Sequence, residues 1–420
     1  MDYEAVIKDT DVIEGLNIRF LKLFRMWNAV NDYRSTGKRN IIIKIYIFGS
    51  FLLTVPAAIF QIESVFTIEF DIQKATFMYM HTLPAISLCC RIIVFWFRMD
   101  SQCKLYDLMR NDFFDIPERL RGKVKELYKE TNKLSNICCL IPFIWNTGIE
   151  IWFIAFPGVS VEYIQHRTGS MSAVTTGSKK ILSGWYPFPV EEYPNYQLVF
   201  AYETLCLLWA ANVMAMYFSL FYQILMCLYA QFVVLGFRLS NLKVEFRDDD
   251  IATLKTSGQE KKNPRINEEL NAILRDHQKL LRYTEELRSI YNPLVTMTLG
   301  LGILIITIGA AQLLLGKTSD PSFLFQLFQI FSFQFIEMSL FCYGSSLIET
   351  ASTDLHFAVY CSDWYRADTK FRKSAQMMMI RARKNMNLTA IVMYPINMET
   401  LGSICQFTYS TAALMSGMVE

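Results

Sequence analysis

His81 and Glu150 are ionisable side chains that lie within long apolar runs of the sequence. An ionisable group inside a membrane span is costly and usually faces a cavity or the interior of a helix bundle. Aromatic residues and methionines recur around them at spacings of three and four, the period of one helix face. We therefore predict a pocket for a small apolar molecule, in which His81 donates or accepts a hydrogen bond. The candidate lining residues are Phe77, Met80, His81, Trp145, Gly148, Trp152, Tyr202, Leu205, Trp209, Phe328 and Phe331. The same aromatic stripes would also suit helix packing or a lipid-facing surface.

Residues that could catalyse a reaction or bind a metal are not arranged to do so. The ten cysteines are scattered, mostly within apolar runs, and no pair has the spacing of zinc ligands. The four histidines are far apart, and the sequence has no phosphate-binding loop, paired-histidine helix or nucleophile elbow. We expect neither an enzyme nor a metal or other cofactor, and no nucleic-acid partner.

The elements that must position the pocket are membrane-spanning helices. Of the 420 residues, 52% are hydrophobic and 19% charged, against about 25% charged in soluble domains. A spanning helix needs about 20 mostly apolar residues. Seven stretches qualify: 39–62, 72–97, 134–157, 198–231, 293–315, 323–348 and 397–418. The sequence therefore predicts an all-α integral membrane protein with seven transmembrane helices. The first forty residues contain no apolar run, so we expect no cleavable signal peptide.

The distribution of lysine and arginine predicts the orientation of these spans. Alternate connections hold 34 basic residues, and the connections on the other side hold five. Basic residues in short loops mark the cytoplasmic side of a membrane. The alternation holds at every loop, so we predict a cytoplasmic amino terminus and an extracellular carboxyl terminus.

This orientation separates the chain from other seven-helix receptors. G-protein-coupled receptors place the amino terminus outside and carry an Asn-Pro-x-x-Tyr motif in the seventh helix. Here Asn292-Pro293 opens the fifth span, and Leu294 and Val295 follow it. A G-protein-coupled receptor and a transporter stay as alternative classes, although we find no internal repeat of the kind that builds secondary transporters.

Two groups of motifs resemble a known family. The loop before the fourth span contains Gly184-Trp185-Tyr186-Pro187-Phe188-Pro189, then Tyr193-Pro194-Asn195-Tyr196. Such a loop suits a lid over helix ends or an aromatic belt at the membrane interface. The carboxyl-terminal region contains Arg381-Ala382-Arg383-Lys384, Leu388-Thr389-Ala390, Pro395, Glu399-Thr400 and Thr408-Tyr409-Ser410. The first group resembles the second outer loop of insect odorant receptors, and the second resembles their terminal signature.

The resemblance is closest to a ligand-tuning subunit. Related gustatory receptors share the inverted seven-helix plan, and their last helix usually has Thr-Tyr followed by Gln-Phe. Here Ser410 follows Thr408-Tyr409, which favours the odorant branch and leaves a gustatory-type channel as the alternative. The odorant co-receptor subunit has a much longer cytoplasmic loop than segment 232–292.

The resemblance implies an odorant-gated, non-selective cation channel. It implies a heterotetramer with odorant co-receptor subunits, in the plasma membrane of olfactory neuron dendrites, surrounded by lipid and permeated by cations. It also implies a cavity among spans two, three, four and six, and a central pore lined by the last span. A cavity with few polar groups suits a volatile apolar ligand such as a terpenoid or an ester.

The expected organisation alternates between membrane and cytoplasm. The parts are a cytoplasmic segment (1–38), spans one to four with an outer loop at 158–197 (39–231), a cytoplasmic loop with helix extensions (232–292), spans five and six (293–348), a cytoplasmic anchor region (349–396) and the pore-lining last span (397–418).

The last span is rich in small and hydroxyl residues, which suit either a wetted pore wall or close helix packing. The candidate pore residues are Thr408, Ala412, Met415 and Ser416. Asn397 is the expected N-cap, with Glu399 in the first turn. Segment 369–387 mixes methionines with basic residues. It suits either an amphipathic helix on the inner membrane surface or, as the resemblance implies, part of the anchor.

Overall fold

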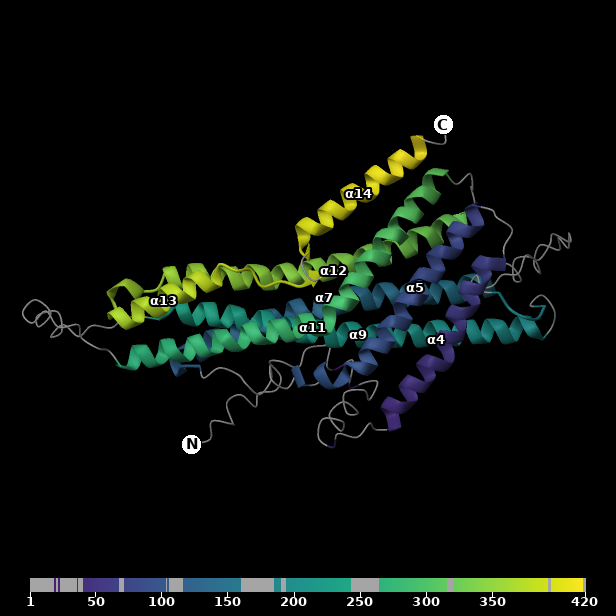
Figure 1. Cartoon of the computed structure of the whole chain (residues 1–420). Coiled ribbons are helices and arrows are strands. Elements are labelled where there is room, and N and C mark those ends of the chain that lie inside the picture. The colour runs from purple at the N-terminus through teal and green to yellow at the C-terminus, as the bar shows by residue number, and fades with distance from the viewer. Residues whose placement is uncertain are drawn as a thin grey trace, which may run out of the picture.

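The computed structural model describes residues 41–67, 72–102, 104–105, 116–159, 185–189, 194–242, 264–315, 321–391 and 394–417, with the single residues 19, 22 and 36. In these ranges the chain is an elongated bundle of long helices (Figure 1). The elements are α4 (Ile41–Thr67), α5 (Ile72–Phe97), α7 (Glu118–Val159), α9 (Asn195–Ser240), α11 (Pro264–Leu315), α12 (Pro321–Tyr360), η2 (Trp364–Arg366), α13 (Thr369–Ala382), β1 (Thr389–Ala390), β2 (Tyr394–Pro395) and α14 (Met398–Gly417).

Each of the seven predicted spans overlaps one of the helices α4, α5, α7, α9, α11, α12 and α14. Within the described residues, three helical stretches are long and apolar enough to cross a membrane: Ile41–Ser64, Gln197–Ser240 and Ile266–Ala311. Thr82–Phe97 is a shorter apolar helix. The number of crossings and their direction stay predictions.

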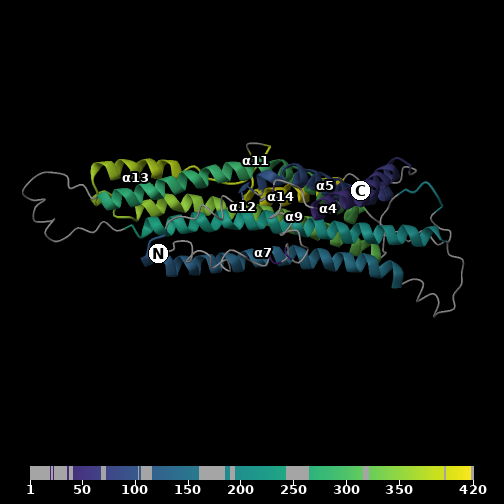
Figure 2. The ribbon, with the colours of Figure 1, turned by 90° about the horizontal axis from the view of Figure 1, so that it is seen from below.

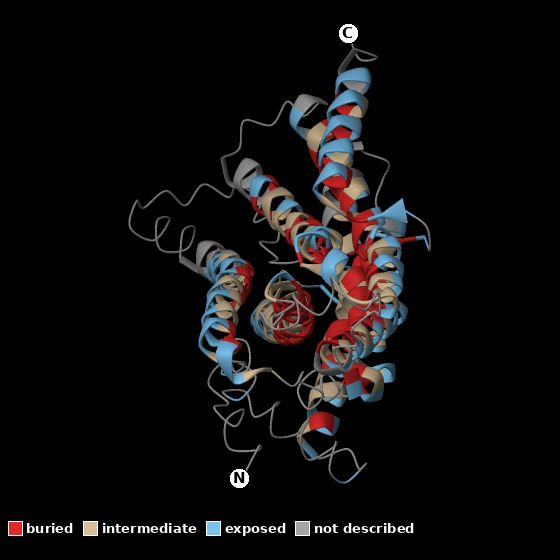
Figure 3. Ribbon diagram, turned by 90° about the vertical axis from the view of Figure 1, so that its left-hand side faces the viewer, coloured by how far each residue is buried: buried red, intermediate tan, exposed pale blue. Residues whose placement is uncertain are grey.

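Four helices are longer than a bilayer requires. At about 1.5 Å per residue, the 52 residues of α11 extend for roughly 78 Å, against a hydrocarbon core of about 30 Å. The extra turns of α9, α11 and α12 pack together with α13 at one end of the bundle. Figure 3, seen along the bundle from that end, shows the buried residues where helices face one another. This end therefore has a core like that of a soluble helical domain.

An ion pair joins two of these extensions. The Arg238 guanidinium of α9 donates to Asp276 of α11 over 2.7 Å, and Arg238 is only 2% exposed. Burial raises the pKa of Asp276, and the hydrogen bond from Arg238 opposes that shift. The pair therefore fixes the register between α9 and α11 outside the predicted spans.

The connection from α13 to α14 is held against α12 by Glu349. Its carboxylate accepts a hydrogen bond from Asn385 over 2.8 Å and another from Asn397 over 3.3 Å. The two-stranded ladder of β1 and β2 lies between these asparagines. The predicted N-cap is confirmed, because the Asn397 side chain accepts from the Thr400 amide over 3.0 Å. Both ends of the connection are thus tied to one residue.

Helix α13 packs against α12 through one face, where Phe371, Ala375, Met378 and Ala382 are buried. Its other face exposes Met377 and Ile380. Segment 369–387 is therefore part of the bundle, as expected for an anchor. The surface that its exposed face meets stays a prediction.

Acidification should destabilise this end of the bundle through His277. His277 lies in α11 ahead of the predicted span, and burial, followed by the positive charge of Arg381, lowers its pKa to about 4. The unfolded chain takes up this proton near pH 6.5. The contribution of neutral His277 to the free energy of unfolding is therefore fully present above that pH. It falls as the pH drops toward 4, by about 2 kcal/mol at pH 5.

The measurement is the melting temperature of the purified protein in detergent at pH 7 and pH 5. His277→Gln should reduce the loss of melting temperature between pH 7 and pH 5. The matched variant His356→Gln should keep the part of that loss which comes from His277. A His277→Gln protein that loses as much stability as the wild type would contradict this explanation.

Candidate functional site

A cavity lies between α7, α9 and α12, which run side by side in Figure 2. Its lining residues recur at helical spacing, so each helix presents one face to it. They are Cys139, Pro142, Phe143 and Asn146 of α7, Met214, Ala215, Phe218 and Ser219 of α9, and Phe333 of α12. The walls are aromatic and aliphatic, with few polar groups.

Three polar groups mark the wall of this cavity. The Ser219 hydroxyl and the Cys139 sulfur lie 3.4 Å apart and share a hydrogen bond, and Asn146 brings an amide. Apolar walls with one or two hydrogen-bonding groups suit a small, mostly apolar ligand whose orientation is set by a single oxygen.

The free space in this cavity is about 20 Å³. One water molecule needs about 10–15 Å³ on this scale, and sites for drug-sized ligands measure roughly 300–1,000 Å³. A ligand of ten heavy atoms or so must therefore displace side chains. Met214 is suited to this, because an unbranched thioether side chain repacks at low cost.

The buried guanidinium of Arg91 lies beside this cavity. Arg91, on α5, is 2% exposed and forms an ion pair with Glu337 of α12. It also donates to the Thr298 hydroxyl of α11 over 2.9 Å and to the Met214 sulfur over 3.5 Å. The Phe218 ring centroid is 6.0 Å from its Cζ atom. Two cavity residues, Met214 and Phe218, thus contact the charge.

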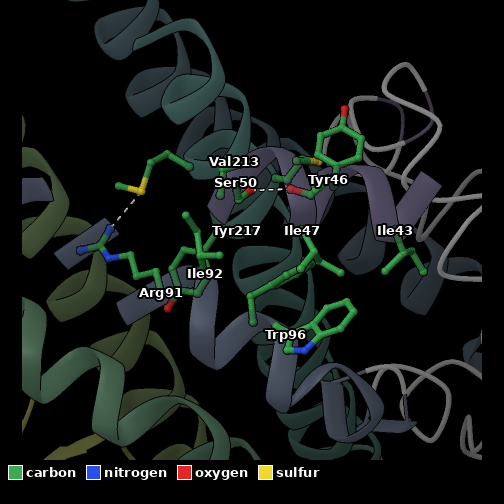
Figure 4. A pocket seen from close by; sticks show the side chains of 12 residues that line it. Ile43, Tyr46, Ile47, Ser50, Arg91, Ile92, Trp96, Val213 and Tyr217 are labelled. Carbon is green, nitrogen blue, oxygen red and sulfur yellow. Dashed lines mark hydrogen bonds between the residues drawn. The ribbon is translucent and has the colours of Figure 1, made fainter. Parts of the chain in front are cut away.

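A second gap, of about 30 Å³, lies on the other side of Arg91, between α4, α5 and α9 (Figure 4). Its lining is mostly aliphatic and aromatic and includes Ile47, Ile92 and Trp96. Arg91 points away from Trp96 and toward Met214 in this view. The gap has room for about two water molecules.

Several residues predicted to bind the ligand lie elsewhere. On α9, Tyr202 donates to the Leu53 carbonyl over 3.0 Å, and the Trp209 indole donates to Ser50 over 3.0 Å. The predicted shared face of Tyr202 and Trp209 therefore meets α4. Leu205, between them, is 56% exposed.

On α12, Phe328 is 58% exposed, and Phe331 lines a groove beside α14. On α7, Trp145 is half-buried and Gly148 is exposed. The side chains of Phe77, Met80, His81, Trp152 and Glu150 lie outside the described part of the chain. No predicted lining residue with a described side chain lines the cavity between α7, α9 and α12.

The predicted pore residues lie on α14, which runs beside the carboxyl-terminal half of α11 in Figure 1. A groove of about 570 Å³ separates α14 from α11 and α12. Thr408 and Ala412 are each 5% exposed and line this groove. The side chains of Met415 and Ser416 are outside the described residues. In this single subunit, the exposed surface of α14 includes Gln406 and Ser410.

The Trp-Tyr-Pro-Phe motif folds over the ends of two helices. The Trp185 amide donates to the Phe60 carbonyl of α4 over 2.9 Å. The Tyr186 hydroxyl donates to the buried Glu203 carboxylate of α9 over 2.7 Å. Burial, together with the Glu203 charge, raises the pKa of Tyr186. These contacts agree with a loop that folds as a lid over helix ends.

One residue of the sequence does point to the surroundings of this cavity. Arg91 is a basic residue inside a predicted span, and such residues face the bundle interior and carry function. Cys139, Ser219 and Phe333 offered no comparable signal, because residues of these types recur throughout the apolar runs.

Comparisons with known proteins agree on one family. A family model described as 7tm odorant receptor matches residues 72–409. Odorant receptor 24a of Drosophila melanogaster is 21% identical over 399 residues, which cover 91% of this chain and 92% of the relative. Odorant receptor 85b of the same species is 24% identical over 195 residues, 46% of this chain and about half (47%) of the relative.

Solved structures share the fold. The insect olfactory receptor OR5 from Machilis hrabei, in complex with eugenol, superposes with a TM-score of 0.73. The match covers 96% of this chain and 99% of that chain at 15% sequence identity. A likeness at this identity concerns the fold alone.

The cavity predicts different effects for two phenylalanines of α12. Phe333→Ala should remove one wall, so the affinity for small apolar molecules should fall by about tenfold or more and their ranking should change. Phe328→Ala, at an exposed position of the same helix, should change neither. Intrinsic fluorescence of the purified protein, titrated with a panel of terpenoids and esters, measures both. Unchanged binding in Phe333→Ala would place the site elsewhere.

Proposed function

This chain belongs to the 7tm odorant receptor family, and we propose that it is the odorant-binding subunit of a heteromeric ligand-gated cation channel. The cavity between α7, α9 and α12 supports this proposal most directly. It is apolar, has two or three polar groups and lies within predicted membrane spans, where volatile apolar molecules dissolve.

The proposed ligand is a small volatile such as a terpenoid or an ester. Its binding would come mostly from burial, at about 25 cal/mol for each Å² of apolar surface. Ser219 and Asn146 would select among ligands by hydrogen bonding to one oxygen. OR5 from Machilis hrabei shares this fold, and its structure was solved in complex with eugenol.

The proposed pore is formed by α14 of several subunits. The hydrogen bonds of Glu349 with Asn385 and Asn397 connect α14 to α12 and α13. A movement of α12 would therefore also displace the start of α14. Thr408 and Ala412 face α11 and α12 in the single subunit. For these residues to line the pore, α14 would have to rotate or the groove beside it would have to open onto the pore axis.

The proposed partner is the odorant co-receptor. Segment 232–292 is of ordinary length, and the pore candidates Ala412 and Ser416 are small, so a partner subunit would supply most of a bulky gate. The proposed location is the plasma membrane, with seven spans and a cytoplasmic amino terminus.

The topology predicts which epitope tags are accessible. A tag before Met1 should bind antibody only in permeabilised cells, and a tag after Glu420 should bind it in intact cells. This pattern follows from the basic residues on alternate connections. An amino-terminal tag that is stained in intact cells would favour a G-protein-coupled receptor instead.

The channel proposal predicts current that depends on the co-receptor. Cells that make this chain together with the co-receptor should show odorant-evoked cation current, and the current should survive blockade of G-protein signalling. Cells that make this chain alone should show little or none, with equal surface labelling as the control. Large currents from this chain alone would refute the proposal that it needs the co-receptor. Loss of current under the blockade would refute the proposal that it forms a channel.

A further inference from the structure

Arg91 brings four helices to one point. The guanidinium of this α5 residue contacts Met214 and Phe218 of α9, Thr298 of α11 and Glu337 of α12. Glu337 is 2% exposed and Thr298 is 2% exposed. Both charged groups are therefore almost fully buried, and each partner is needed to stabilise the others.

Ligand entry must disturb this cluster. The cavity holds about 20 Å³ of free space, so a ligand of ten heavy atoms has to move lining side chains. Met214 and Phe218 are two of those side chains, one turn apart on α9, and both contact the guanidinium. Moving either one changes the packing around Arg91.

The cluster continues along α12 toward α14. Phe333 lines the cavity, and Glu337 lies one turn further on the same face. The next residue, Met338, lines the groove against Leu401, Ile404 and Cys405 of α14. Met338 also fixes the approach of α11, because a Cβ atom at Gly302 would lie 2.6 Å from its sulfur. A shift of α12 at Glu337 therefore moves a residue that lines the groove beside α14.

We propose that Arg91 is a positioning residue that transmits occupancy of the cavity between α7, α9 and α12 to α14 through its ion pair with Glu337. The ligand displaces Met214 and Phe218, the guanidinium moves with them, and Glu337 carries α12 and Met338 to a second packing against α14. The proposal rests on the proposed odorant-gated channel and adds to it the residue that couples binding to opening.

A purely structural role for this pair predicts something different. Replacing a buried ion pair by apolar residues of similar volume is often neutral or stabilising, whereas removing one partner leaves a buried charge and is strongly destabilising. The double variant Arg91→Met with Glu337→Met therefore preserves packing and deletes only the polar link.

The test expresses this double variant with the co-receptor. The probe is the terpenoid or ester of a fixed panel that evokes the largest wild-type current. We expect surface labelling and fluorescence-detected binding of the probe within about threefold of the wild type. The maximal evoked current per labelled receptor should fall at least fivefold. The matched control, Lys44→Met, removes another basic residue within a predicted span, at an exposed position, and should respond like the wild type.

A double variant with wild-type binding and wild-type maximal current would overturn the proposal while leaving the channel intact. If the double variant does not reach the cell surface, Thr298→Val tests the proposal instead. This substitution removes only one acceptor of Arg91 and keeps the side-chain shape. A fall of at least twofold in its maximal current at unchanged binding supports coupling, and an unchanged current refutes it. Absence of evoked current in the wild type would instead refute the proposed function.

Discussion

A guanidinium group inside a membrane bundle has to be surrounded by partners, because no water is present to solvate it. Arg91 meets this requirement with a carboxylate, a hydroxyl, a sulfur and the rings of Tyr217 and Phe218. These partners come from α9, α11 and α12, so satisfying one charge on α5 fixes how four helices pack. A shift of any of these helices leaves a buried charge or a buried acceptor unpaired.

Buried polar partners also connect the helices outside the predicted spans. Arg238 and Asp276 join α9 to α11 there, and Glu349 holds both ends of the connection that leads to α14. Long helices therefore link two polar clusters across a largely apolar core. Such an arrangement moves as a unit more readily than it deforms, since close-packed interiors transmit displacement. The proposed ligand cavity lies beside the Arg91 cluster, and Met214 and Phe218 belong to both.

The sequence was sufficient for the helices but insufficient for the cavity. Apolar runs of about 20 residues locate spans reliably, and the N-cap at Asn397 follows from local hydrogen bonding. The sequence does not show which face of an apolar helix meets the protein core, because lipid and core select the same side chains. Tyr202 and Trp209 have helical spacing, yet their polar atoms bond to α4 rather than to a ligand site. Arg91 was the more informative residue, because its charge restricts it to the interior.

If the odorant occupies the space between α7, α9 and α12, it displaces the side chains that contact Arg91. Electron cryomicroscopy maps of the complex with the co-receptor, with and without the most effective volatile, test this displacement. We predict ligand density beside Ser219 and Phe333, with Met214 and Phe218 moved relative to the ligand-free map. Ligand density in another part of the subunit, with Met214, Phe218 and the Arg91–Glu337 pair unchanged, would contradict it.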